Sequence, residues 1–143
     1  MKVSRTVAYA LHAMLQLAQT DSKTPVPCSQ LACEGKMPER FLLQILRNLV
    51  THDLLLSTRG VDGGYTLLHR PEEITLIDVL DAFENPLTPT MPLLATLPAA
   101  TEEKLKQALS RATDLARSEL SRLSLADLVC TNVDEPDPVV QQA

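Results

Sequence analysis

The feature that most constrains the fold is a glycine-rich stretch at residues 59–69, Arg-Gly-Val-Asp-Gly-Gly-Tyr-Thr-Leu-Leu-His. Three of the four glycines in the chain lie here, within five positions. An apolar run at residues 54–56 precedes the stretch, and Tyr65, Leu67 and His69 alternate after it. Glycines between two strand-like runs are typical of a β-hairpin that needs a positive φ or a close backbone approach. We therefore expect a hairpin over about residues 54–69.

Helical periodicity dominates the chain before this hairpin. Residues 2–20 carry apolar side chains at helical spacing, with polar side chains opposite. A short helix is expected over residues 28–34, closed by Gly35. The next helix should run from about Pro38, a residue suited to a first helical position, to Thr51. Its apolar arc of roughly 140° comprises Phe41, Leu42, Ile45, Leu46 and Leu49.

The second half of the chain predicts two further helices separated by a linker. Thr75 and Asp78 match a capping box that opens a short helix ending near Phe83. Four prolines mark residues 85–100 as a linker. Thr101 is then expected to cap a long helix. Its apolar stripe, which needs a partner, comprises Leu105, Leu109, Ala112, Ala116, Leu120 and Leu123.

These elements predict a mainly α fold with a small β-hairpin, organised as a winged helix-turn-helix domain and a long C-terminal dimerisation helix. The expected boundaries are residues 1–84 for the winged domain, 85–100 for the proline-rich linker, 101–130 for the dimerisation region and 131–143 for a disordered acidic tail. Residues 1–70 hold eight Lys/Arg and five Asp/Glu, whereas residues 71–143 hold five and thirteen. A basic half joined to an acidic half favours a nucleic-acid-binding domain joined to an element that does not bind nucleic acid.

Composition excludes several other classes. The chain has no run of about 18 apolar residues and no signal-peptide pattern, so a cytoplasmic protein is expected. Three cysteines without paired spacing argue against a disulfide scaffold. We find no Ser/His/Asp, Cys/His or paired-carboxylate arrangement with catalytic spacing, which makes an enzyme the least favoured interpretation.

The helix that begins near Pro38 is the candidate recognition helix. A major groove admits one helix, and Arg40 and Arg47 suit contacts to phosphate or guanine. Gln44 suits a bidentate pair with adenine, and Leu43 suits contact with a thymine methyl group. The alternative is an ordinary amphipathic helix with a solvated face, which the neighbouring helix, turn and hairpin make less favoured.

The hairpin is the candidate wing. Arg59 at its base suits a narrow minor groove, where the negative potential is enhanced. Gly60, Gly63 and Gly64 would let backbone amides approach phosphates, and Tyr65 would pack beneath the wing. The alternative is a surface hairpin with an incidental arginine. A phosphate-binding loop is disfavoured, because no Gly-Lys-Ser/Thr follows the glycines.

From Met1 to about Glu84 the chain resembles the bacterial winged-helix regulators typified by the iron–sulfur assembly regulator and the nitric-oxide-sensing repressor. The resemblance rests on residues 3–11, 41–46, 59–60, 63–65 and 74–80. It implies a transcriptional regulator, acting as a homodimer joined through the long C-terminal helix on a palindromic operator. The candidate DNA contacts are Arg5, Arg40, Phe41, Leu43, Gln44, Arg47, Arg59, Gly60, Gly63, Gly64 and Tyr65.

The chain departs from this family pattern at three places, one of which is Leu43, where several members carry a glutamate in the recognition helix. Val61 and Asp62 replace the usual Pro-Gly of the wing tip, which should weaken phosphate contact there. Residues 85–105 contain no cysteine, although cluster-binding members place three cysteines in that region. We therefore expect no cysteine-ligated iron–sulfur cluster and no other cofactor. Cys28 and Cys33 would lie roughly 140° apart on one helix.

Two other functions remain open. One is a redox or metal sensor with atypical ligands such as His12 and a cysteine. Among the three cysteines, Cys130 lies in an acidic neighbourhood, which would not lower the pKa of its thiol. The other is a protein-interaction module that kept the winged fold. The leading hypothesis remains a dimeric repressor. Its effector, target genes and operator sequence are not indicated.

Overall fold

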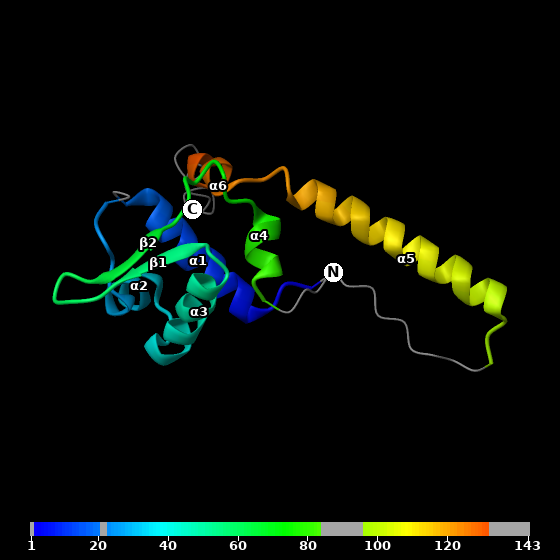
Figure 1. Ribbon diagram of the computed structural model, residues 1–143, viewed down its shortest axis with the longest axis horizontal. Helices are drawn as coiled ribbons and strands as arrows, with labels where there is room; N and C mark the ends of the chain where they lie inside the picture. Colours follow the sequence, from blue (N-terminus) through cyan, green and yellow to red (C-terminus); the bar gives the residue numbers. More distant parts are fainter. Residues whose placement is uncertain (1, 21–22, 84–95, 132–143) are drawn as a thin grey trace, which may run out of the picture.

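The computed structural model describes residues 2–20, 23–83 and 96–131. Over these residues the chain forms six helices and one two-stranded sheet (Figure 1), which confirms the expected mainly α fold with a hairpin. Residues 85–95 of the expected linker and 132–143 of the expected tail lie outside the described part. The elements are α1 (Arg5–Gln19), α2 (Cys28–Gly35), α3 (Glu39–Thr51), β1 (Leu55–Thr58), β2 (Gly64–Leu67), α4 (Leu76–Asp81), α5 (Ala99–Leu120) and α6 (Leu125–Thr131).

The first three helices surround an aliphatic core, to which the hairpin contributes Leu55. The turn between α2 and α3 differs from the expectation, because Lys36 and not Gly35 adopts the left-handed conformation, with φ of 53°. Gly35 is the last residue of α2. A Cβ at that position would lie 2.5 Å from Met37 Cε and 3.0 Å from His12 Nδ1. The glycine is therefore explained by close packing. Pro38 is the N-cap of α3 and not its first helical residue.

The hairpin is antiparallel, with Leu55 opposite Leu67 and Thr58 opposite Gly64. Its second strand is also bridged on the other edge by the segment before α2. The Val26 N–H donates to the Tyr65 carbonyl at 3.0 Å, and the Tyr65 N–H donates to the Val26 carbonyl at 2.9 Å. A three-segment ribbon therefore ties the base of the wing to the helix-turn-helix unit.

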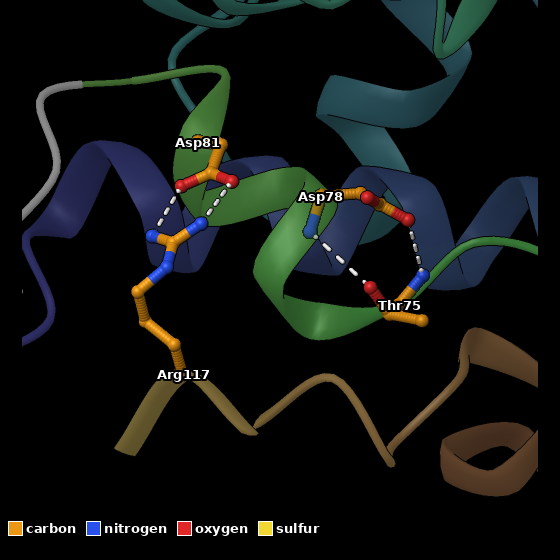
Figure 2. Close-up of polar contacts among 4 residues, drawn as sticks. All are labelled: Thr75, Asp78, Asp81 and Arg117. Atoms are coloured by element: carbon orange, nitrogen blue, oxygen red, sulfur yellow. Dashed lines mark hydrogen bonds and ion pairs between the residues drawn. The ribbon is translucent and has the colours of Figure 1, made fainter. Parts of the chain in front are cut away.

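The predicted capping box of α4 is confirmed. The Asp78 N–H donates to Thr75 Oγ1 at 3.3 Å, and the Thr75 N–H donates to Asp78 Oδ2 at 2.9 Å (Figure 2). The two bonds satisfy backbone donors that a helix N-terminus otherwise leaves free. The helix ends at Asp81, two residues before the expected Phe83.

The long helix α5 begins earlier than expected and extends away from the winged domain (Figure 1). Its N-cap is Pro98, so the prediction that Thr101 caps it is wrong. Ala99 and Ala100 are strong helix formers and extend the helix toward the proline. The helix ends at Leu120, so Leu123 lies beyond it.

After α5 the chain returns to the winged domain, which the sequence reasoning did not anticipate. The Leu76 N–H donates to the Leu123 carbonyl, and the Leu125 N–H donates to the Ile74 carbonyl, both at 2.9 Å. Helix α6 then packs against α1, with Leu125 fully buried in the main core. The C-terminal segment is therefore part of the domain that carries the wing.

Candidate nucleic-acid interface

Helix α3 presents a polar face to solvent. Leu42, Ile45, Leu46 and Leu49 are buried, which anchors the helix to the core. Arg40, Gln44 and Arg47 are all exposed and lie within an arc of roughly 60° at 100° per residue. These three residues form this exposed face of α3, the reading face. Leu43 borders the reading face and is half-buried.

The wing ends in a tight turn. The Gly63 N–H donates to the Gly60 carbonyl at 3.1 Å, so Val61 and Asp62 form the tip, with Val61 fully exposed. Gly60 has φ of +113°, a conformation that other residues adopt only with strain. Arg59 follows β1 directly and is exposed. The turn therefore fixes the position of Arg59 at the base of an exposed loop.

Glycine at position 64 lets the wing approach the helix-turn-helix unit closely. A Cβ there would lie 2.4 Å from the Val26 carbonyl carbon and 2.7 Å from Pro27 N. Any larger residue would push the strand away and weaken the Val26–Tyr65 bridge. The expected approach of the Gly64 amide to phosphate stays a prediction, and within the protein the glycine permits this close contact with the Val26 backbone.

Tyr65 lies at the base of the wing. Burial raises the pKa of Tyr65, and the nearby Cys28 thiol adds to the increase. The Arg47 guanidinium acts in the opposite direction on the same pKa. Tyr65 itself joins the wing base to the segment before α2 through its two backbone hydrogen bonds with Val26.

Phe41 connects α3 to α1. Its ring meets the Tyr9 ring edge to face, with centroids 5.7 Å apart and an interplanar angle of 76°. Phe41 remains 37% exposed, so one part of the ring packs and another stays at the surface. Arg5 is exposed at the start of α1, where Ser4 Oγ accepts a hydrogen bond from the Val7 N–H at 3.3 Å.

The exposed arginines are available to an anionic partner. Within residues 2–20, 23–83 and 96–131, no ion pair is formed by Arg5, Arg40, Arg47 or Arg59. Exposed cations that pair with no carboxylate of the described residues favour binding to phosphate, because no salt bridge among those residues must break first.

The described residues do not form a metal site. No three His, Cys, Asp or Glu side chains converge in the described part of the chain. His12 Nδ1 lies 3.3 Å from Gln16 Oε1, and the Cys28 thiol lies 3.7 Å from the Glu39 carbonyl. Burial raises the pKa of the Cys28 thiol, and the Glu39 carboxylate raises it further. His12 and Cys28 thus each bond within the protein, and no third potential ligand joins either of them in the described part of the chain.

The stripe of α5 divides into two parts. Leu105 and Leu109 are 44% and 40% exposed, and Ala112 is exposed as well. Ala116 and Leu120 instead pack against a second small core within the same chain. The first part is thus open to a second molecule, and Leu123, which lies beyond the helix, is 40% exposed as well. No helix of the described residues is both long and apolar enough to cross a membrane.

A helix-turn-helix with an exposed polar helix, followed by a glycine-tipped hairpin, defines a winged-helix regulator of transcription. Residues 3–131 match the family model Rrf2, described as an iron-dependent transcriptional regulator. The chain belongs to the Rrf2 family. It is 30% identical over 128 residues to the HTH-type transcriptional regulator CymR of Bacillus subtilis (strain 168), covering 90% of this chain and 89% of CymR.

Solved structures agree with this assignment. CymR of B. subtilis, the global cysteine regulator of that organism, has a TM-score of 0.73 at 29% identity, covering 92% of this chain and 98% of CymR. IscR of T. potens has a TM-score of 0.67 at 25% identity, covering 99% of this chain and 96% of IscR. These similarities confirm the predicted winged-helix fold with its long C-terminal helix.

A further relative is a protein of Mycobacterium tuberculosis (strain ATCC 25618 / H37Rv) that bears the name of an HTH-type transcriptional regulator. It is 42% identical over 87 residues, which are 61% of this chain. The match spans about half the length of that relative, 54%.

Proposed function

We propose that the protein binds a palindromic double-stranded DNA operator as a homodimer and represses transcription from it. The observation that carries this proposal is an exposed polar helix followed by a glycine-tipped hairpin, whose exposed arginines form no ion pair within the described residues. Exposed cations on a helix of this kind and on the hairpin after it favour a DNA partner over an enzyme or an interaction module without DNA. We place its action in the bacterial cytoplasm, where the DNA is.

Helix α3 enters the major groove in this proposal. Gln44 pairs with adenine, and Arg40 and Arg47 contact guanine or phosphate. Leu43, at the edge of the reading face, contacts a thymine methyl group. Phe41 and Arg5 lie at the side of this surface next to α1 and meet the DNA backbone.

The wing reaches the adjacent minor groove. Arg59 supplies the contact, because a narrow minor groove concentrates negative potential. The exposed tip contributes little, since the Asp62 carboxylate repels phosphate. Gly60, Gly63 and Gly64 act by shaping the turn and its approach to the domain.

The first part of the α5 stripe joins the two protomers. Leu105, Leu109 and Ala112 are exposed on a helix with no buried residue, so a second copy of the helix would cover them. Two winged domains held by this helix pair would meet half-sites about one helical turn, roughly 34 Å, apart. In this proposal residues 1–84 read DNA, and the part of residues 101–130 that links protomers is the exposed stripe at Leu105, Leu109 and Ala112, without a cysteine-ligated cluster.

Arginine substitutions test the proposal by fluorescence anisotropy on a selected operator. Arg47→Ala should weaken binding and reduce the salt slope by about 1, because one phosphate contact is lost. Arg59→Ala should weaken binding by roughly tenfold or more. Arg122→Ala is the matched control, since it removes the same charge from an exposed pair with Glu119. Unchanged affinity of Arg59→Ala would contradict the wing contact.

A further inference from the structure

The C-terminal end of α4 is held from two sides by residues distant in sequence. The Asn48 side-chain amide, on α3, donates to the Ala82 carbonyl at 2.6 Å. The adjacent Asp81 carboxylate accepts two hydrogen bonds from Arg117 on α5, at 2.9 and 2.8 Å (Figure 2). The recognition helix and the long helix therefore attach to neighbouring residues of one short element.

Helix α4 is itself firmly seated. Its capping box secures the first turn, and Val79 is fully buried in the main core. Ile77 and Leu80 form the second small core together with Val7 of α1, and Ala116 and Leu120 of α5 pack against it. An element fixed by both cores holds its two partners in one relative orientation, because packed interiors deform little.

The Arg117–Asp81 pair is suited to setting an angle rather than to adding stability. A guanidinium and a carboxylate joined by two parallel bonds share a plane as well as a distance. The two side chains are 35% and 40% exposed, so solvent screens their attraction and the stabilisation is small. Losing the pair should thus leave the fold intact and free the long helix to tilt.

The effect of such a tilt is large compared with the dimensions of DNA. Leu105 lies 12 residues before Arg117, a distance of roughly 18 Å along a helix. A tilt of about 10° over that length displaces the far end by roughly 3 Å. This displacement is close to the rise of one base pair, about 3.4 Å.

We propose that Asn48 and Arg117 are positioning residues that fix the recognition helix relative to α5 and so set the half-site spacing that the dimer accepts. This inference rests on the proposed function, in which α5 joins two protomers on a palindrome. The residues act through Asp81 and Ala82 and need not touch DNA.

Operators with altered spacing test this positioning role. Anisotropy titrations compare the affinity of the protein for the selected operator with its affinity for operators that carry one or two extra base pairs between the half-sites. The wild-type protein should discriminate against the altered spacings, and Arg117→Ala and Asn48→Ala should lower that discrimination by roughly fivefold. Arg122→Ala loses the same charge from an exposed pair with Glu119 and should retain the wild-type discrimination. The proposal is overturned if Arg117→Ala discriminates between the spacings as strongly as the wild-type protein does. A general loss of stability would give that result, because it lowers the affinities for the selected and the altered operators by the same factor.

A measurement without DNA separates this inference from the proposed function. A spin label at Val61→Cys, in a background with Cys28, Cys33 and Cys130 changed to serine, reports the distance between the two wings. Electron double resonance should give a narrow distribution for the wild-type background and a broader one for Arg117→Ala. The positioning role is overturned if the two distributions are equally narrow. It is also overturned if the protein is monomeric and gives no wing-to-wing distance. Broadening in a protein that selects no DNA sequence supports the positioning role and rejects the proposed function.

Discussion

Replacing Leu125 by alanine should destabilise the winged domain, although Leu125 lies far from the wing in sequence. Its side chain is fully buried in the main core and comes from α6. Leucine to alanine removes three carbon atoms, worth about 2.4 kcal/mol of transfer free energy at about 0.8 kcal/mol each. A residual cavity of roughly 50 Å³ adds about 1 kcal/mol. The expected loss in the free energy of unfolding is therefore about 3.5 kcal/mol.

Urea unfolding, followed by far-UV circular dichroism at one fixed protein concentration, measures this loss. Leu123→Ala is the matched control, because Leu123 lies two residues away and is 40% exposed. It should change the free energy of unfolding by less than about 1 kcal/mol. Alanine has a higher helix propensity than leucine. A lower free energy of unfolding in Leu125→Ala therefore does not reflect a weaker intrinsic tendency of α6 to form a helix. Equal unfolding free energies for the two variants would refute the claim that α6 completes the core.

Two further predictions concern the junction between the wing and the helices. Gly64→Ala should lower the free energy of unfolding by about 1–3 kcal/mol, because its Cβ would meet the Val26 carbonyl; unchanged urea unfolding would contradict the close approach. In single-cysteine variants at pH 8, Cys28 should react with iodoacetamide roughly tenfold more slowly than exposed Cys33. Burial and Glu39 raise the pKa of Cys28, so less thiolate is present; equal rates would argue against this arrangement.

The parts of the fold that depend on local sequence could be predicted. The glycine hairpin, the amphipathic α3 and the Thr75–Asp78 capping box each follow from residues close in sequence. The predicted helix boundaries were less accurate at Gly35 and Thr101. Gly35 is the last residue of α2, where it packs closely against Met37 and His12, and Ala99 and Ala100 start α5 before Thr101. Local periodicity and turn chemistry therefore account for most of the candidate DNA-binding surface.

Contacts between distant segments could not be predicted in this way. The Val26–Tyr65 bridge and the Asn48 contact to Ala82 depend on the tertiary arrangement, which no periodicity encodes. Helix α6 did carry a signal that was missed. The Ser124 hydroxyl accepts from the Asp127 N–H at 3.2 Å, while Asp127 Oδ2 accepts from the Ser124 N–H at 3.0 Å. This is the same capping pattern that opened α4.

The long helix shows why a stripe alone does not define an interface. Six apolar positions suggested one dimerisation surface, yet Ala116 and Leu120 pack within their own chain. The exposed part within α5, at Leu105, Leu109 and Ala112, is shorter than the stripe, and exposed Leu123 lies beyond the helix. In the proposed dimer, α5 consequently both joins protomers and contacts α4.

Selection of binding sites from a random pool of double-stranded DNA tests the central claim most directly. The account predicts enrichment of a palindrome whose half-site centres are about 10 base pairs apart, because two recognition helices enter successive major grooves. Arg47→Ala and Arg59→Ala should bind the enriched sequence more weakly than Arg122→Ala does. Failure to enrich any sequence, or enrichment of a lone half-site, would contradict the account of a dimeric regulator.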